Sequence, residues 1–321
     1  MTNKLRYPKY FLAHHELFPE PDIFHIETDK DGIAMWDYAH AKGHFSRARA
    51  GRLGLGIQYV PWVISFYALG MYNLYYETPK KTCLEKFFKH ADFLVGNLTE
   101  RKNFGVWLVQ FPWNAPCYLC KPPWISGMYQ GLGLSTLVRA WVISENEKYI
   151  VAARKASLSF EVPVSKGGVL KVDNKGFWWY DEYACARRAN VLNGFLFALI
   201  GIYEYYDVSK DPKALHLFNK GIKTVRNYID KYDLNFLVFK WSKYDDKLLF
   251  YSGPKYHNWH VKQLLKLHEI TRDKEFLIWA MRWFNYQQIY NSLVTSKLFR
   301  LLLFPYNLTT SKLAQFAYKV K

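Results

Sequence analysis

Four stretches of this chain repeat one pattern: an apolar run of helical length, a short turn, a lysine, and an amphipathic run of helical length. The turn lysines are 68, 65 and 61 residues apart, and they are Lys80, Lys148, Lys213 and Lys274. Turns that contain Thr-Pro, Asp-Pro or Asn end one helix and cap the next. A single helical hairpin cannot bury its apolar face, so successive hairpins must stack. The repeat therefore predicts a mainly α fold, an (α/α) toroid or an incomplete barrel of helical hairpins.

The loops between the repeats are expected to gather at one end of such a ring and to shape a cleft. Two loops have strand character: "GGVLKVD", which ends at Asp173, and residues 236–253, which we expect to form a β-hairpin with a polar turn. No linker rich in Gly, Ser or Pro interrupts the sequence. We therefore expect one (α/α) catalytic domain over residues 58–321, with residues 1–57 as an N-terminal extension that packs on it.

The chain of 321 residues carries a net charge of +17, and half of its residues are hydrophobic. A basic surface attracts nucleic acid, anionic lipid or acidic polysaccharide, although a generally solvated surface accounts for the charge equally well. The sequence contains no helix-turn-helix, zinc-finger or RNA-binding pattern, so nucleic acid is not an expected partner. The tail, residues 296–321, is both basic and apolar. It leaves two alternatives open, contact with a membrane surface or packing as a last helix, and we favour the second.

The start of the sequence lacks the apolar core and cleavage site of a signal peptide, and no run is apolar enough to span a bilayer. A cytoplasmic location is therefore expected. Four cysteines in a chain of this length do not make a disulfide-dense scaffold. "CYLC", residues 117–120, has the spacing of zinc and redox sites but lacks a second pair, so we interpret it as structural. No metal and no cofactor are expected.

Residues 177–195, "FWWYDEYACARRANVLNGF", bring acids, phenols and guanidinium groups to the start of an apolar helical run. At the cleft end of a helix pair, the candidates to project into the cleft are Tyr180, Asp181, Glu182 and Tyr183. Alternate side chains of an extended segment point to opposite sides, so we expect Glu182 to point away from Tyr183. The alternative is an edge strand whose aromatic side chains only pack.

Two other repeats carry polar clusters at the equivalent place. The clusters contain Trp124 and Gln130 before one helix, and Tyr256, His257 and His260 before another. The two histidines are three residues apart, a spacing compatible with a metal site. The sequence between them lacks the acid of an HExxH motif, so we do not expect a metal there.

Three blocks of the sequence resemble conserved blocks of the D-glucuronyl C5-epimerase family: "SGMYQGLGLSTLVRAW", "WYDEY" followed by "VLNGFLFALIGIYEYYD", and "YHNWHVKQL". They occur in the family's order and spacing within residues 58–288, and the combination is specific although no single block is. The resemblance implies an (α/α) toroid domain, in agreement with the repeat, and a heparosan-type glycan as substrate. Because family members form dimers, a homodimer stays open. Animal members also carry a β-barrel domain, which this chain is too short to hold.

Epimerisation at C5 removes the proton beside a uronate carboxylate and returns one to the opposite face of the sugar. It needs a proton acceptor, a proton donor and stabilisation of the carboxylate charge. By resemblance, Glu182 and Tyr183 match the family's acid–tyrosine pair. Tyr256 and Tyr244 match two further family tyrosines. We therefore predict Glu182 and Tyr256 as the proton-transfer pair, while Tyr183 and Tyr244 polarise the carboxylate or the ring oxygen.

The predicted substrate-binding residues comprise two arginines and a tyrosine close to the acid–tyrosine pair, together with residues of the other two polar clusters. Arginine suits a uronate because its planar fork binds both carboxylate oxygens. The family is not arginine-rich at this place, so the two arginines are a local inference. The set consists of Arg187, Arg188, Trp124, Gln130, Tyr180, His257 and His260.

The predicted function is conversion of D-glucuronic acid residues of a glycan to L-iduronic acid, and three alternatives stay open. A uronate lyase begins with the same proton abstraction but then expels the C4 substituent, which gives an unsaturated product that absorbs in the ultraviolet. A glycoside hydrolase needs two carboxylates that flank the bond, which the neighbours Asp181 and Glu182 do not provide. A non-catalytic module would bind acidic glycan through its basic face.

Overall fold

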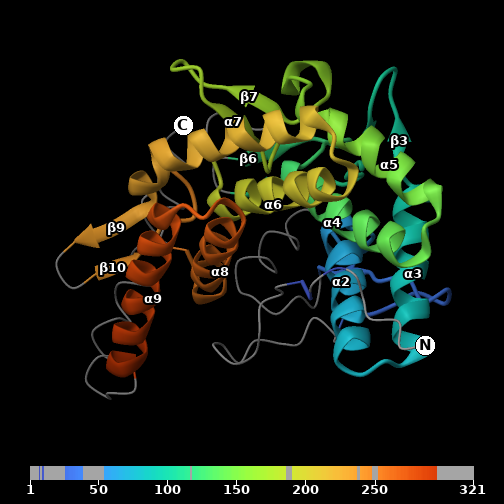
Figure 1. Ribbon diagram of the computed structural model, residues 1–321, viewed down its shortest axis with the longest axis horizontal. Coiled ribbons are helices and arrows are strands. Elements are labelled where there is room, and N and C mark those ends of the chain that lie inside the picture. The colour runs from blue at the N-terminus through green and yellow to red at the C-terminus, as the bar shows by residue number, and fades with distance from the viewer. Residues whose placement is uncertain are drawn as a thin grey trace.

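Helices dominate the fold, and they form four consecutive pairs that follow one another round an arc (Figure 1). The computed structural model describes residues 7, 9–10, 26–38, 54–115, 118–185, 190–236, 239–247 and 252–294. The pairs are α2 (Pro61–Glu77) with α3 (Lys81–Gly96), α4 (Gly127–Ser144) with α5 (Glu147–Ser157), α6 (Leu192–Ser209) with α7 (Pro212–Tyr228), and α8 (Pro254–Thr271) with α9 (Lys274–Val294). In each pair the first helix lies on the inner side of the arc. The predicted architecture of helical hairpins is confirmed.

Three of the four turns within these pairs share one geometry. The inner helix ends at a residue with a left-handed backbone, and the side chain of the next residue accepts a hydrogen bond from the backbone at the start of the outer helix. These residues are Glu145 and Asn146, Lys210 and Asp211, and Arg272 and Asp273. Asn and Asp cap helices in this way, which is the reason why the turn pattern was visible in the sequence.

The inner helices pack closely and enclose an aromatic core. A Cβ atom on Gly131 of α4 would lie 2.6 Å from the Cα atom of Ala198 of α6, so only glycine permits this approach. On the inner side of the arc, Phe66 of α2 stacks on Trp259 of α8 with ring centroids 5.6 Å apart. The ring of Phe197 in α6 packs edge-on against both. Helices at the two ends of the arc are therefore joined through aromatic contacts.

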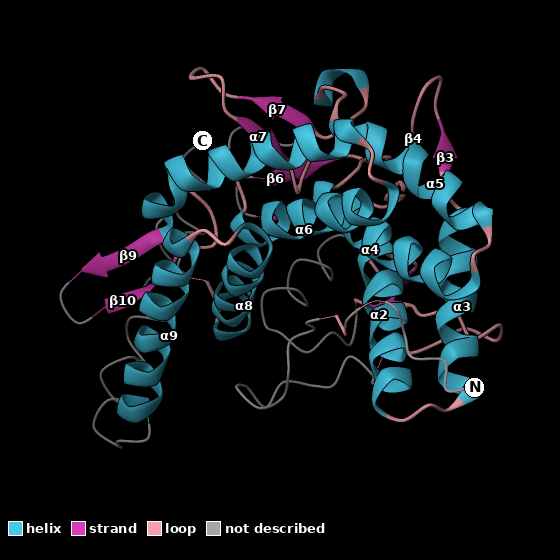
Figure 2. Cartoon of the chain, in the orientation of Figure 1, coloured by secondary structure: helices cyan, strands magenta, loops and turns pink. Residues whose placement is uncertain are grey.

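The described residues form five two-stranded antiparallel pairs, whose strands are drawn in magenta in Figure 2. The pairs are β1 (Trp36–Asp37) with β2 (Ile57–Gln58), β3 (Thr99–Glu100) with β4 (Gly105–Val106), β5 (Trp113–Ala115) with β6 (Tyr118–Cys120), β7 (Leu170–Val172) with β8 (Trp178–Tyr180), and β9 (Asp233–Phe236) with β10 (Phe239–Ser242). The strand predicted in "GGVLKVD" is confirmed as β7.

The hairpin predicted over residues 236–253 is tested only in part, because residues 237–238 and 248–251 lie outside the described residues. Within the described residues, β10 pairs with β9, which precedes the predicted hairpin. After β10, the side chain of Asp245 accepts a hydrogen bond from the backbone N–H of Lys247 at 2.8 Å, which makes a polar turn. The backbone N–H of Ser252 then donates to the carbonyl oxygen of Ser242 at 2.8 Å, so the chain returns to the end of β10.

The described parts of the N-terminal region pack on the helices. The backbone N–H of Tyr10 donates a hydrogen bond to the side chain of Asn73 in α2 at 2.8 Å. The ring of Tyr10 also lies 4.8 Å from the guanidinium of Arg139, a buried residue that forms a two-bond ion pair with Glu204 at 2.8 and 3.0 Å. Within the described part of the chain, no helix has both the length and the apolar character needed to cross a bilayer.

Candidate active site

The loops that precede α4, α6 and α8 meet at the end where these three inner helices begin. The backbone N–H of Gly127, at the start of α4, donates to the carbonyl oxygen of Asp181 at 2.7 Å. The backbone N–H of Leu192, at the start of α6, donates to the carbonyl oxygen of Tyr244 at 3.1 Å. These bonds bring together three polar clusters that are far apart in the sequence.

Glu182 lies buried at the centre of this end, with 6% of its surface exposed. The Tyr244 hydroxyl donates a hydrogen bond to its Oε1 at 3.3 Å. Its carboxyl also packs against Gly194 in the first turn of α6, where an added Cβ would lie 2.6 Å from Cδ of Glu182. Glycine at position 194 therefore makes the space that the carboxyl occupies.

The burial of Glu182 changes its protonation. Burial raises its pKa to about 8, although hydrogen bonds from Tyr183, Tyr244 and the Gly194 N–H act in the opposite direction. A carboxyl with this pKa both holds and releases a proton near neutral pH. Such a group is suited to general acid–base catalysis.

Three half-buried tyrosines adjoin Glu182. The hydroxyls of Tyr183 and Tyr244 are 3.4 Å apart, and the ring of Tyr256 packs edge-on against that of Tyr244 with centroids 5.1 Å apart. Burial, together with the nearby Glu182 carboxyl, raises the pKa of Tyr183 and Tyr244 well above the usual value for tyrosine. The phenols therefore stay protonated at neutral pH and act as hydrogen-bond donors. Tyr244 connects Glu182 to Tyr256.

Glu182 and Tyr183 point into one cluster, so the predicted alternation between them is wrong. Strand β8 ends at Tyr180 and residues 182–185 form a turn, so the two-residue period of a strand does not apply. Asp181 belongs to a separate ion pair, with its carboxylate 3.2 Å from the Nζ atom of Lys171. Burial raises the pKa of Asp181 to about 6, against the lowering effect of Lys171.

A disulfide between Cys120 and Cys185 ties the end of β6 to the turn that carries Glu182. The two residues are 65 positions apart, so the link restricts the unfolded chain and contributes about 4 kcal/mol to stability. This agrees with a structural role for "CYLC", but the sequence did not predict the partner. Cys117 lies outside the described residues.

Three aromatic residues near the cluster were not identified from the sequence. Burial and the neighbouring Tyr38 raise the pKa of Tyr129 in α4, as do the Tyr183 and Glu182 groups beside it. The ring of Trp113 lies 5.3 Å from that of Tyr38. Tyr129 belongs to the quoted block "SGMYQG", which was a usable signal. Tyr38 follows the two-residue strand β1, and Trp113 begins the three-residue strand β5. Elements this short carry no periodic pattern that would mark them.

His257 and His260 lie in the core behind the tyrosines, with no exposed surface. Each Nδ1 atom lies within hydrogen-bonding distance of the Ser242 Oγ atom, at 2.7 and 2.8 Å. The Nε2 atom of His257 lies 2.9 Å from the carbonyl oxygen of Trp283. Burial lowers the pKa of His257 to about 4 and that of His260 well below its usual value, so both rings are neutral at pH 7.

These contacts exclude the predicted contact of both histidines with substrate, because the rings do not reach the surface. The network instead joins Ser242, at the end of β10, to the first two turns of α8. Tyr244 follows Ser242, and Tyr256 precedes His257 in the chain. The histidines therefore hold the segments that carry these two tyrosines in place.

Three other predicted binding residues are also buried. Trp124 is 4% exposed, and its indole N–H donates to the carbonyl oxygen of Phe111 at 2.9 Å. Gln130 is fully buried, and the hydroxyl of Tyr180 donates to the carbonyl oxygen of Leu217 at 2.6 Å. Because these side chains lie inside the protein, they support the cluster rather than present a sugar-binding surface.

The predicted substrate ligands Arg187 and Arg188 lie outside the described residues, as does the tail 296–321. In the described ranges, His, Cys, Asp and Glu side chains nowhere form a group of three that could hold a metal ion. The chemistry that the described site offers is therefore that of a buried carboxyl and several phenols.

Comparison with known proteins identifies the relationship. The family model described as "D-glucuronyl C5-epimerase C-terminus" matches residues 101–285, which include Glu182, Tyr183, Tyr244 and Tyr256. The chain belongs to the D-glucuronyl C5-epimerase family. Membership places it among the carbohydrate epimerases, which are isomerases.

Two relatives and one solved structure show the extent of the similarity. An uncharacterised protein from Methanocaldococcus jannaschii is 29% identical over 248 residues, which are 71% of this chain and 78% of that protein. The D-glucuronyl C5-epimerase of Caenorhabditis elegans is 32% identical over 220 residues, which are 62% of this chain and only 34% of the worm enzyme. A GH76 α-mannanase from Bacteroides thetaiotaomicron aligns with a TM-score of 0.47 at 12% identity, over 70% of this chain and 56% of that one.

Proposed function

We propose that this member of the C5-epimerase family converts D-glucuronic acid residues of a glycan to L-iduronic acid. One observation carries the proposal: a buried carboxyl with a pKa of about 8, Glu182, is hydrogen-bonded to a tyrosine that packs on a second tyrosine. The reaction requires two proton-transferring groups and donors for a developing negative charge. The cluster offers both kinds of group within one site.

In the proposed reaction, the Glu182 carboxylate takes the C5 proton of the uronate. The electron pair of the broken C–H bond moves into the carboxylate, which becomes enolate-like. Hydroxyls of Tyr183 and Tyr244 donate hydrogen bonds to this charge, the kind of stabilisation that provides the largest share of many rate enhancements. Their high pKa keeps the donor protons in place.

The second face of the sugar is assigned to Tyr256. Its hydroxyl gives a proton to C5. The resulting phenolate then recovers a proton from solvent and Glu182 releases the one it took, which restores both groups. Solvent reaches Tyr256 because its side chain is half-buried and not sealed in the core. The uronate carboxylate remains the predicted ligand of Arg187 and Arg188. An acidic glycan is the proposed partner, in keeping with the basic net charge of +17.

The test is solvent exchange at C5. In D₂O, the protein is expected to introduce deuterium at C5 of glucuronate residues in a heparosan-type oligosaccharide and to accumulate iduronate. The variants Glu182→Gln and Tyr256→Phe should lower the exchange rate by at least about 100-fold each. Tyr76→Phe, which alters a tyrosine exposed on α2, is the matched control and should exchange at the normal rate.

Two outcomes would contradict the proposal. An ultraviolet-absorbing unsaturated product would identify a lyase, since epimerisation produces none. Binding of the glycan without any exchange in the unaltered protein would identify a binding module. In that case the variants would change affinity and there would be no turnover to lose.

A further inference from the structure

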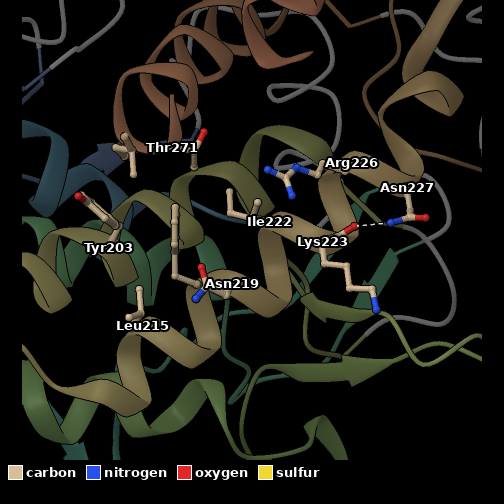
Figure 3. Close-up of a pocket in the computed structure, with 10 residues that line it drawn as sticks. Tyr203, Leu215, Asn219, Ile222, Lys223, Arg226, Asn227 and Thr271 are labelled. Carbon is tan, nitrogen blue, oxygen red and sulfur yellow. Dashed lines mark hydrogen bonds between the residues drawn. The ribbon is translucent and has the colours of Figure 1, made fainter. Parts of the chain in front are cut away.

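A hollow whose lining includes neither Glu182 nor the tyrosines beside it lies among three helices. It has a volume of about 660 Å³ and is lined by residues of α6, α7 and α8 (Figure 3). Its residue Tyr203 is about 16 Å along α6 from Leu192, and its residue Thr271 is about 22 Å along α8 from Tyr256. The hollow therefore lies toward the opposite ends of the helices whose first turns carry the catalytic cluster.

The lining of this hollow combines an apolar floor with a polar rim. Phe218 and Ile222 of α7 contribute the floor, and the rim includes Asn219, Arg226 and Tyr203. Asn219 and Arg226 are exposed. In Figure 3 the Arg226 guanidinium extends over the hollow toward Thr271. A volume of this size accommodates a small ligand, and amide, hydroxyl and aromatic groups together suit a sugar ring.

Arg226 is held in a fixed orientation that leaves donors available. Its Nε–H donates to Oδ2 of Asp273 at 2.6 Å. Asp273 is itself fixed, because its Oδ1 accepts a hydrogen bond from the backbone N–H of Glu275 at 3.0 Å. No other hydrogen bond of this guanidinium occurs among the residues that the structure describes. Its two terminal amino groups therefore remain for a planar anion, which arginine binds with two parallel hydrogen bonds.

The charge around the hollow favours an anion. The nearby carboxylates Asp273, Asp207 and Glu269 are each paired with a cation, namely Arg226, Lys210 and Lys266. Lys223, on the rim, is exposed and has no carboxylate partner within the described ranges. Helix α7 itself contains no acidic residue. The hollow therefore carries positive charge that no carboxylate of the described residues offsets, which favours an anionic ligand.

We infer that this hollow binds a second uronate residue of the same glycan chain, outside the reacting centre. The inference rests on the proposed function for the identity of the glycan. Arg226 holds the carboxylate, Asn219 and the Tyr203 hydroxyl bind sugar hydroxyls, and the apolar floor packs against the ring. Such a site lets the protein hold a polymer at two places, which raises the effective concentration of uronate residues at Glu182.

The test measures binding by calorimetry with Glu182→Gln protein, so that no turnover intervenes. The ligands are a long heparosan-type oligosaccharide and its carboxyl-reduced, neutral counterpart. Arg226→Gln should weaken binding of the acidic oligosaccharide about tenfold, the loss expected for a charge-assisted pair of hydrogen bonds. The neutral counterpart should bind weakly to both proteins.

Asp273→Asn is the decisive control. It breaks the same ion pair as Arg226→Gln but keeps the guanidinium, and Asn still caps α9. Binding should then change by less than about twofold, since an exposed pair contributes little by itself. Lys213→Gln removes an equal charge from α7 at a position that does not line the hollow, and should leave affinity near normal.

Equal weakening by Arg226→Gln and Asp273→Asn, or no weakening by Arg226→Gln, would overturn the inference. Competition by single-stranded DNA as effective as that by the acidic oligosaccharide would also overturn it. Because the assay needs no catalysis, its result is independent of the exchange test. If exchange is absent but binding still depends on Arg226, the proposed function is wrong and the second binding site is supported.

Discussion

Replacement of Gly194 by alanine should move the Glu182 side chain while it changes the stability of the protein only little. Alanine favours the interior of a helix over glycine by about 1 kcal/mol. The added Cβ, however, would lie 2.6 Å from Cδ and 2.7 Å from Cβ of Glu182, while ordinary contacts begin at 3.4 Å. Because Oε2 of Glu182 lies closer still to the added Cβ, the side chain must move by at least about 0.8 Å, the difference between 3.4 Å and the distance to Cδ. A misplacement of this order at a catalytic group costs roughly 100-fold in rate.

We therefore expect Gly194→Ala to lower the C5 exchange rate about 100-fold while the melting temperature changes by only a few degrees, since overpacking and helix propensity oppose each other. The matched control is Gly96→Ala at the end of α3, where an added Cβ meets no atom within 4 Å. It should retain the full rate. Full activity of a folded Gly194→Ala protein would refute the placement of Glu182 against α6.

Three further predictions follow from the charges and hydrogen bonds of the site. The pKa of Glu182 is raised from 4.5 to about 8, so its contribution to stability is fully present below pH 4.5 and is lost as the pH rises through 8. This contribution is on the order of 5 kcal/mol. Denaturant titrations from pH 5 to 9 should therefore show a free energy of unfolding that falls with pH, and Glu182→Gln should flatten this slope. The pKa of His257 is lowered from 6.5 to about 4, so its contribution to stability is present above pH 6.5 and is lost as the pH falls through 4. The midpoint of acid unfolding should therefore move to lower pH in His257→Asn. An unchanged midpoint would contradict the Ser242 network. Tyr244→Phe removes a hydrogen bond that lowers the pKa of Glu182, so the apparent pKa in the pH–rate profile should move to higher pH and the rate should fall about 100-fold. A lower rate without this change in pKa would show that Tyr244 and Glu182 are not coupled.

The sequence was sufficient to predict the helical hairpins because their signals are local. A lysine follows each apolar run, and in three of the four turns an Asn or Asp precedes it as the cap; the structure shows the same left-handed turn after α4, α6 and α8. The sequence signal for strand β7 was equally local. The pairing of β10 with β9 was not predicted, because β9 precedes the segment whose composition indicated a hairpin.

The acid and the phenols of the site were predictable for another reason. Glu182, Tyr183 and Tyr256 occur in blocks that resemble a family, and the structure places them in one cluster with Tyr244. Burial was not predictable from the sequence. His257 and His260 look like polar residues at the entrance of a helix, but contacts with Ser242 and Trp283 place them in the core.

Contributions from distant segments were also hidden. Tyr38 joins the site from the N-terminal region, and Cys120 pairs with Cys185 across 65 positions. Neither has a local pattern, because each depends on where the complete ring brings its segment. The role of Gly194 in making space for the Glu182 carboxyl was also not predictable, since glycine occurs at the start of a helix for many reasons.

The central claim is that Glu182 exchanges a proton near neutral pH, and its titration tests this most directly. In protein labelled with ¹³C at the glutamate side-chain carboxyl, one resonance should titrate with a pKa of about 8 and should be missing from the spectrum of Glu182→Gln. If the resonance that is lost in this variant titrates instead near 4.5, the usual value for glutamate, the claim is contradicted.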